Sequence, residues 1–205
     1  MATRTDEQLL QTYREGDTAA FKMLIERHHE DLLRFLVRLT GDRQAAEDVF
    51  QETFLQVHIS ADTFDATRRF KPWLFTIAAN KARDMLRKRV RRQEVDLSAP
   101  VNRGGGSSRG GEGGQTFVDL MEIDVPAPDE GLQGQERDQL VQQAVDRMPS
   151  SLKEILLLAY FQKLSYAQIA EELDIPLGTV KSRLHSAVAT FAKHWQSVSA
   201  GLNKS

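Results

Sequence analysis

A glycine-rich segment near the middle of the chain constrains the fold more than any other feature of the sequence. Residues 102–115 read NRGGGSSRGGEGGQ and hold seven of the thirteen glycines. A proline-rich, acidic run follows between Asp124 and Glu130. Such a composition cannot bury enough apolar surface to offset the entropy of ordering it, so a flexible tether is expected. The sequence therefore predicts two lobes, residues 5–92 and 136–195, joined by a flexible linker of residues 93–135.

Helix signals dominate the first lobe. They predict helices at about residues 5–16, 17–41, 42–57 and 70–92. Thr5 and Gln8 have the spacing of a capping box, and Asp17 is a good N-cap for the second helix. Residues 58–69 show little periodicity and are predicted to form a loop. No alternating strand pattern is found, so we expect an all-helical lobe.

The second lobe is also predicted to be helical. Its helices are expected at about residues 136–148, 151–162, 165–173 and 176–195. Ser151 with Glu154, and Ser165 with Gln168, have the spacing of capping boxes, and Pro176 fits the first turn of the last helix. The fold class is therefore all-α, with two small helical domains.

The second lobe contains the pattern of a helix-turn-helix. Residues 164–187 read LSYAQIAEELDIPLGTVKSRLHSA. Ile169 and Leu173 form the inner stripe of the first helix, and Val180 and Leu184 form that of the second. The alternative is an ordinary helical hairpin with a solvated polar face.

The outward face of the second of these helices suits DNA. It carries Thr179, Lys181, Ser182, His185 and Ser186, with Arg183 nearer the flank. Short hydrogen-bonding side chains and cations can contact base edges and phosphates. There is no acidic residue between Pro176 and Trp195, which favours the DNA-binding interpretation.

Residues 68–92 form a strongly basic stretch. They hold ten lysines and arginines against one acid, Asp84, for a net charge of +9. One polar face carries Thr76, Asn80, Arg83 and Arg87, and aromatic residues cluster at the start of the helix: Phe64, Phe70, Trp73 and Phe75. Exposed bases of single-stranded DNA stack on aromatic rings while cations follow the backbone. The alternative is a charged face that is simply solvated.

The helix that precedes this stretch has a different surface. Asp48, Gln51, Glu52 and Leu55 follow helical spacing and form an acidic and polar stripe with one leucine. This stripe is either plain surface or a docking face for another helix.

Together these blocks resemble the sigma-70 family, and within it the extracytoplasmic-function group. AEDVFQETF and FKPWLFTIAANKARDMLRKR look like sigma region 2, and residues 148–187 look like region 4. Regions 1 and 3 are absent, as in that group. The resemblance implies a bacterial transcription initiation factor, which binds core RNA polymerase, recognises −35 and −10 promoter elements and assists DNA melting.

The resemblance also implies a role for each surface. Contact with the β′ clamp helices of the polymerase falls to Asp48, Gln51, Glu52 and Leu55. Capture of the melted −10 element falls to Phe64, Trp73, Asn80, Arg83 and Arg87. The residues that would recognise the −35 element are Thr179, Lys181, Ser182, Arg183 and His185. The β flap would be a further contact on the polymerase. The linker would follow the RNA-exit path, and residues 93–140 carry a suitable net charge of −7.

Two departures from the group are visible. The linker is long and glycine-rich, and Ser186 and Val188 stand where relatives often carry basic residues. Anti-sigma factors are common partners in the group, but the sequence identifies none.

Other functions are less compatible with the sequence. A free-standing helix-turn-helix regulator would leave the acidic stripe and the aromatic-basic helix unexplained. The five histidines form no His-x-x-x-His pair, and neither Gly-x-Ser-x-Gly nor a phosphate-binding loop is present, so no enzymatic activity is expected.

Composition sets further expectations. There is no cysteine, which excludes disulfides and thiolate zinc sites, and we expect neither a metal nor a cofactor. Residues 1–14 lack the apolar stretch of a signal peptide, and no apolar run reaches the roughly 18 residues of a spanning helix. A cytoplasmic protein without membrane insertion is expected.

Overall fold

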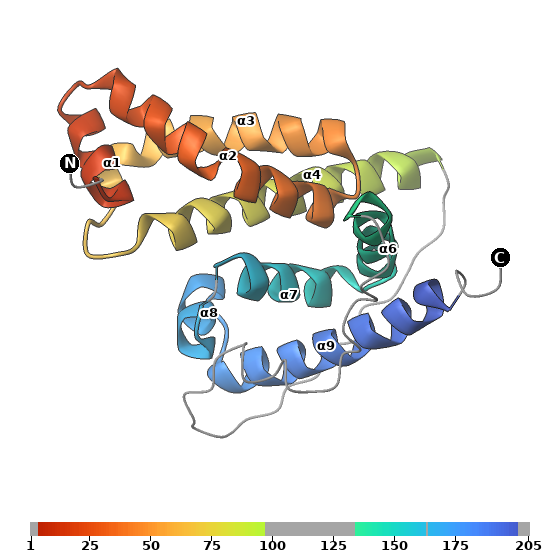
Figure 1. The fold of residues 1–205 in the computed structure, drawn as a ribbon. Coiled ribbons are helices and arrows are strands. Elements are labelled where there is room, and N and C mark those ends of the chain that lie inside the picture. Colours follow the sequence, from red (N-terminus) through yellow and green to blue (C-terminus); the bar gives the residue numbers. More distant parts are fainter. Residues whose placement is uncertain (1–3, 97–133, 163, 201–205) are drawn as a thin grey trace. The chain divides into compact units, whose positions relative to one another are not determined.

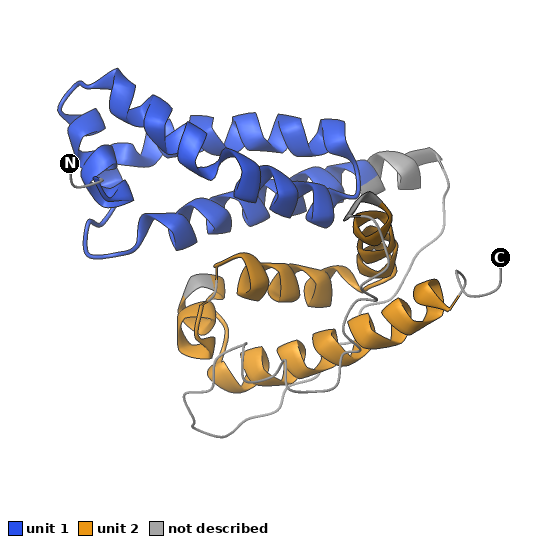
Figure 2. Cartoon of the chain, in the orientation of Figure 1, with its two compact units in different colours: residues 1–104 blue, residues 105–205 orange. Residues whose placement is uncertain are grey.

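The computed structural model describes residues 4–96, 134–162 and 164–200 of the chain. These residues form eight α-helices and one short 3-10 helix, and no β-strand occurs among them. The chain divides into two compact units, residues 1–104 and residues 105–205 (Figure 1, Figure 2). The prediction of an all-α protein with two helical units is confirmed. Residues 97–133, most of the predicted linker, lie outside the described residues.

The first unit is a helical bundle. Its elements are α1 (Asp6–Arg14), α2 (Thr18–Thr40), α3 (Arg43–Ser60), η1 (Ala61–Thr63) and α4 (Phe70–Asp96). Helix α2 packs against α1, α3 and α4, and α3 also packs against α4 (Figure 1). The core between them contains fully buried leucines and phenylalanines, among them Leu9, Leu24, Leu32, Phe35, Leu36, Leu74 and Phe75. Burying each such side chain contributes about 1.5–3 kcal/mol to folding.

Local chemistry sets the ends of these helices. Thr5 and Gln8 form the predicted capping box, with N···O distances of 3.2 and 2.9 Å. Asp17 and Asp42 each accept a hydrogen bond from an amide in the first turn of the helix that follows. Between α2 and α3 the chain turns at Gly41, whose φ of 74° is readily adopted only without a Cβ atom.

The connection between α3 and α4 is shorter than predicted. A loop was expected at residues 58–69, but α3 continues to Ser60 and η1 follows. The Thr63 hydroxyl donates to the Ser60 carbonyl at 2.9 Å, so polar side chains here support the helical turns. Beyond them, the Asp65 carboxylate accepts from the amide and hydroxyl of Thr67 at 2.9 and 2.7 Å, which makes a local turn.

The second unit is built around one long helix. Its elements are α6 (Gly134–Asp146), α7 (Ser150–Gln162), α8 (Tyr166–Leu173) and α9 (Leu177–Ser199). Helix α9 packs against the other three. Its first half shares a buried cluster with α7 and α8, and its second half packs against α6 through Leu140, Ala144, Trp195 and Val198.

One of the two predicted capping boxes in this unit forms. Ser165 and Gln168 are linked in both directions, at 2.9 and 3.4 Å. The box predicted at Ser151 and Glu154 is wrong, because it needs Ser151 just before the helix, whereas α7 begins at Ser150 and Ser151 lies inside it. The carbonyl of Pro149 instead accepts from the amides three and four residues later, at 3.0 and 2.9 Å.

Candidate nucleic-acid interface

Helices α8 and α9 form the predicted helix-turn-helix. Ile169, Val180 and Leu184 are at most 1% exposed where the two helices cross. Leu173 and Ile175 pack against the same cluster and are partly buried. The inner stripes predicted from the sequence are therefore confirmed, and they fix which side of α9 faces outward.

Backbone hydrogen bonds fix the turn between the two helices. Asp174 ends α8 in the left-handed region, at φ 50° and ψ 50°. The Ile175 amide donates to the Ala170 carbonyl at 3.0 Å, and the Thr179 amide donates to the Pro176 carbonyl at 2.8 Å. Pro176 thus precedes the first turn of α9 instead of lying in it as predicted.

The outward side of α9 carries the five predicted DNA-contacting residues. Ser182, Arg183 and His185 are exposed, while Thr179 and Lys181 are partly buried. The Ser182 hydroxyl donates to the Thr179 carbonyl at 3.2 Å, but this bond leaves the hydroxyl oxygen able to accept another. These positions form a continuous polar face on the helix, suited to base edges and phosphates.

A second candidate surface begins at the start of α4. The rings of Phe64 and Trp73 lie 4.7 Å apart, and Phe70 lies 6.2 Å from Phe64. Phe64 and Phe70 are buried, whereas Trp73 keeps part of its surface exposed. Phe75, which the sequence placed in this cluster, is fully buried in the core against Phe35 at 5.2 Å. Trp73 is therefore the accessible aromatic side chain of this group.

The predicted polar face continues along α4. Asn80 and Arg87 are exposed, and Thr76 and Arg83 are partly buried. An Arg83 guanidinium nitrogen donates to the Asn80 side-chain oxygen at 3.0 Å, and Arg87 lies 4.0 Å from the Asp84 carboxylate. Since this Arg83 contact uses the Asn80 oxygen, the amide nitrogen of Asn80 is oriented as the available donor.

Helix α3 presents the acidic and polar stripe to solvent. Asp48, Gln51 and Glu52 are exposed, and Leu55 is 58% exposed. The structure adds Ile59, which lies one turn further on, is 65% exposed and was not among the residues predicted for the stripe. Ile59 lies four residues after Leu55, and this spacing, which places both on the same face of a helix, could have indicated it in the sequence. The stripe therefore ends in an exposed apolar pair.

Comparison with known families places both units. Residues 24–92 match the family model Sigma-70 region 2, and residues 138–191 match Sigma-70, region 4. The chain is 30% identical over 172 residues to the ECF RNA polymerase sigma factor SigW of Bacillus subtilis, covering 84% of this chain and 87% of that protein. The chain belongs to the extracytoplasmic-function group of the sigma-70 family. This sigma factor is thus a transcription initiation factor with a region 2 and a region 4 domain.

Other proteins are similar to this sigma factor in sequence or in fold. It is 32% identical over 184 residues to the RNA polymerase sigma-H factor of Pseudomonas aeruginosa, covering 89% of each chain. Its fold resembles CnrH, solved with the cytosolic domain of CnrY, at a TM-score of 0.61 and 21% identity over 94% of this chain and 97% of the other. The same TM-score relates it to the sigma factor RpoE of Bartonella quintana, at 22% identity over 86% and 96% of the two chains.

A metal site and a membrane-spanning helix are both absent from the part of the chain that the structure describes. Within residues 4–96, 134–162 and 164–200, no three histidine, aspartate or glutamate side chains are grouped so that they could hold a metal ion. No helix in this part of the chain is long and apolar enough to cross a membrane.

Proposed function

We propose that this sigma factor contacts promoter DNA and RNA polymerase through three separate helix surfaces. Helix α9 reads the −35 element through Thr179, Lys181, Ser182, Arg183 and His185. Helix α4 and the preceding loop capture the −10 element through Phe64, Trp73, Asn80, Arg83 and Arg87. Helix α3 binds the β′ clamp helices through Asp48, Gln51, Glu52 and Leu55. The functional domains span residues 5–92 and 136–195, and residues 93–135 link them.

The outward face of α9 carries the proposal. It is a polar, acid-free helix surface held at a fixed angle by the buried contacts of the helix-turn-helix. The exposed Ser182 and His185 can donate to or accept from base edges in the major groove. Arg183 lies at the side of the face, which suits a phosphate contact.

The −10 surface is supported by the geometry at the start of α4. Trp73 is partly exposed and can stack on an unpaired base, with Phe64 packed behind its ring at 4.7 Å. With only 7% of its surface exposed, Phe64 serves by holding Trp73 and not by stacking on a base itself. Asn80 and Arg83 follow along the same helix and supply hydrogen-bond donors for the melted strand.

The polymerase contact is supported by the composition of the α3 stripe. Two exposed carboxylates, Asp48 and Glu52, precede the exposed Leu55 along the helix, so a partner helix with cations next to an apolar side chain would match it. Core RNA polymerase is the partner that follows from the family, with the β flap as a second contact for the region 4 domain. RNA polymerase is cytoplasmic, and we place this sigma factor in the same compartment.

An anti-sigma factor is a further partner in the proposal. The structure of Bartonella quintana RpoE was solved in complex with the anti-sigma factor NepR. By this likeness, a regulator that covers the α3 stripe would keep the present protein from core enzyme. A regulator of this kind should compete with core RNA polymerase for the purified protein.

A free-standing operator-binding regulator is the alternative, and a pair of assays separates the two. With a promoter selected from a random DNA library by the reconstituted holoenzyme, permanganate footprinting should show polymerase-dependent opening. In a gel shift without polymerase, the full-length protein should bind the same duplex weakly. Tight specific binding by the isolated protein, without polymerase-dependent opening, would establish the alternative.

Single substitutions test the −10 assignment within the same assays. Asn80→Ala and Arg83→Ala should lower permanganate reactivity by about tenfold while closed complexes still form, because these side chains would meet only unpaired DNA. Lys22→Ala, which removes a cation from the exposed surface of α2, is the matched control and should open the promoter normally. Normal opening by both α4 variants would refute the assignment.

A further inference from the structure

Helix α1 touches both ends of the segment that joins α3 to α4. It lies before residues 24–92, the part of the chain that matches the region 2 family model. It packs against α2, and it also contacts η1 and α4. The segment in question, residues 61–69, carries Phe64 and leads into the start of α4.

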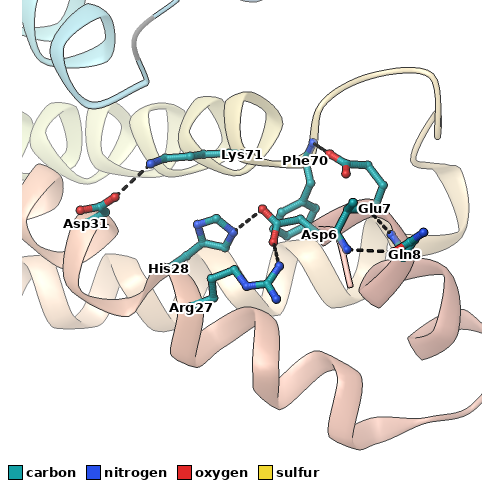
Figure 3. Close-up of polar contacts among 9 residues, drawn as sticks. Asp6, Glu7, Gln8, Arg27, His28, Asp31, Phe70 and Lys71 are labelled. Carbon is teal, nitrogen blue, oxygen red and sulfur yellow. Dashed lines mark hydrogen bonds and ion pairs between the residues drawn. The ribbon is translucent and has the colours of Figure 1, made fainter. Parts of the chain in front are cut away.

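The downstream end of the segment is fixed by Glu7. Its carboxylate Oε1 accepts a hydrogen bond from the Phe70 amide at 2.9 Å (Figure 3). Phe70 begins α4, and the first amides of a helix have no partner within that helix. A carboxylate at this place also offsets the positive end of the helix. Glu7 therefore caps α4 from 63 positions earlier in the chain.

The first turn of α1 is itself anchored on α2. The Asp6 carboxylate accepts from an Arg27 guanidinium nitrogen at 2.5 Å and lies 2.8 Å from Nε2 of the buried His28 (Figure 3). The His28 ring packs on the Phe70 ring at 5.6 Å. Because Asp6 and Glu7 are adjacent in the first turn of α1, the anchor on α2 also fixes the backbone that carries the Glu7 side chain.

The last turn of α1 holds the upstream end of the segment. A guanidinium nitrogen of Arg14 donates to the Asp62 carbonyl at 3.3 Å, and Arg14 Nε lies 3.7 Å from the Asp62 carboxylate. Next to this pair, the Tyr13 hydroxyl is hydrogen-bonded to Nδ1 of His58 near the end of α3. The segment is thus fastened to one helix at both of its ends.

We propose that Glu7 and Arg14 are positioning residues for promoter opening, because they fix the segment that places Phe64 behind Trp73. The inference rests on the −10 function proposed for that surface. Phe64 lies between the two attachments and packs on both Phe70 and Trp73. Losing either attachment would leave Phe64 without a single position, so the Trp73 ring would lose the side chain that supports it, and ordering Phe64 again would oppose base capture.

Amide hydrogen exchange of the free full-length protein tests the attachments without polymerase. Glu7→Ala should raise exchange of the Phe70 amide and of residues 61–69 by about tenfold, because a hydrogen bond to a charged group is lost. Arg14→Ala should raise exchange at residues 61–64. Glu15→Ala is the matched control, because it removes an exposed carboxylate that, among the described residues, accepts a side-chain hydrogen bond only from Gln11 of α1.

The start of α4 should remain docked in these variants. Lys71 Nζ lies 2.9 Å from the Asp31 carboxylate of α2, an attachment that neither substitution touches. Protection of the core amides of α2 and α3 should therefore be unchanged. A uniform loss of protection across the first unit would mean that Glu7 stabilises the fold as a whole, and would overturn the proposal.

The functional test uses the reconstituted holoenzyme on the selected promoter. Glu7→Ala and Arg14→Ala should slow promoter opening by about tenfold with core affinity within twofold of wild type, as expected for a lost hydrogen bond of this strength. Glu7→Gln keeps a carbonyl oxygen that can accept from Phe70, and it should restore opening to within about threefold of wild type. If Glu7→Ala simply damaged the fold of the first unit, its affinity for core enzyme would fall together with promoter opening.

The remaining outcomes separate this inference from the proposed function. If Glu7→Ala and Arg14→Ala open the promoter normally while Asn80→Ala does not, the positioning role is wrong and the −10 assignment stands. If all three open it normally, the −10 assignment itself fails.

Discussion

Side chains on the outward face of α9 differ in what they can contribute to DNA binding. Ser182 and His185 can make directional contacts with bases, so Ser182→Ala or His185→Ala should change base preference in the −35 element, at about 1–3 kcal/mol per lost contact. Arg183→Ala should weaken binding to all sequences alike. It should also reduce the slope of log binding constant against log salt concentration by about one unit, because one phosphate contact is lost. Binding of holoenzyme to a −35 sequence library at several salt concentrations measures both effects. A sequence-specific loss in Arg183→Ala would contradict this division.

The carboxyl group of Asp6 makes the stability of the folded state depend on pH. Burial alone raises the pKa of its carboxyl, but the hydrogen bonds and charges of His28 and Arg27 outweigh burial and hold this pKa below the usual 3.8. The unfolded chain therefore binds the proton more readily, so the carboxylate stabilises the folded state above pH 3.8 and loses this effect as the pH falls below that value.

The variant Asp6→Asn should show this dependence. At neutral pH it should lower the free energy of unfolding by about 2 kcal/mol, because bonds to a charged acceptor are lost. The difference from wild type should shrink as the pH falls below 3.8. Urea unfolding monitored by circular dichroism at several pH values measures it, and a difference that grows in acid would have the wrong sign.

At the scale of single elements, α3 offers the most direct test of polymerase docking. The double variant Asp48→Lys and Glu52→Lys places cations where the partner surface is expected to be basic, and it should weaken core binding at least tenfold at low salt. Both side chains are exposed, so the helix should stay folded. The control, Glu26→Lys with Glu30→Lys, makes the same charge change on exposed positions of α2. Equal affinities for the two double variants would refute the docking face.

Elements were predictable from sequence where their determinants are local. The capping boxes at Thr5 and Ser165 involve residues three positions apart, and both form. The box at Ser151 has the same spacing but does not form, because α7 already begins at Ser150, where the Pro149 carbonyl accepts the first hydrogen bonds of the helix. The sequence placed Phe64 and Trp73 in one aromatic cluster, and their rings do meet. The burial of Phe64, however, depends on how the segment before α4 folds back, which no local pattern encodes.

The whole molecule combines opposite charges that nearly cancel. A net charge of −2 hides +9 over residues 68–92 and −7 over residues 93–140, and this division was visible in the sequence. Long-range attachments were not: Glu7 and Phe70 are 63 positions apart, and neither residue type signals the other. The division into two helical units could be predicted, because composition and periodicity mark it in the sequence. The structure agrees with it, since each unit has its own buried core.

These separate cores predict how the chain responds to proteolysis. Proteinase K should cut first within residues 101–115, where small and polar residues offer little to pack, and it should release two helical fragments. Each purified fragment should unfold cooperatively, because its buried leucines and aromatic residues contact partners within the same unit. Removing a few glycines should leave both transitions unchanged, since the entropy of a tether varies slowly with its length. First cleavage inside either helical unit, or a fragment that unfolds without a transition, would show that the two units depend on each other for their stability.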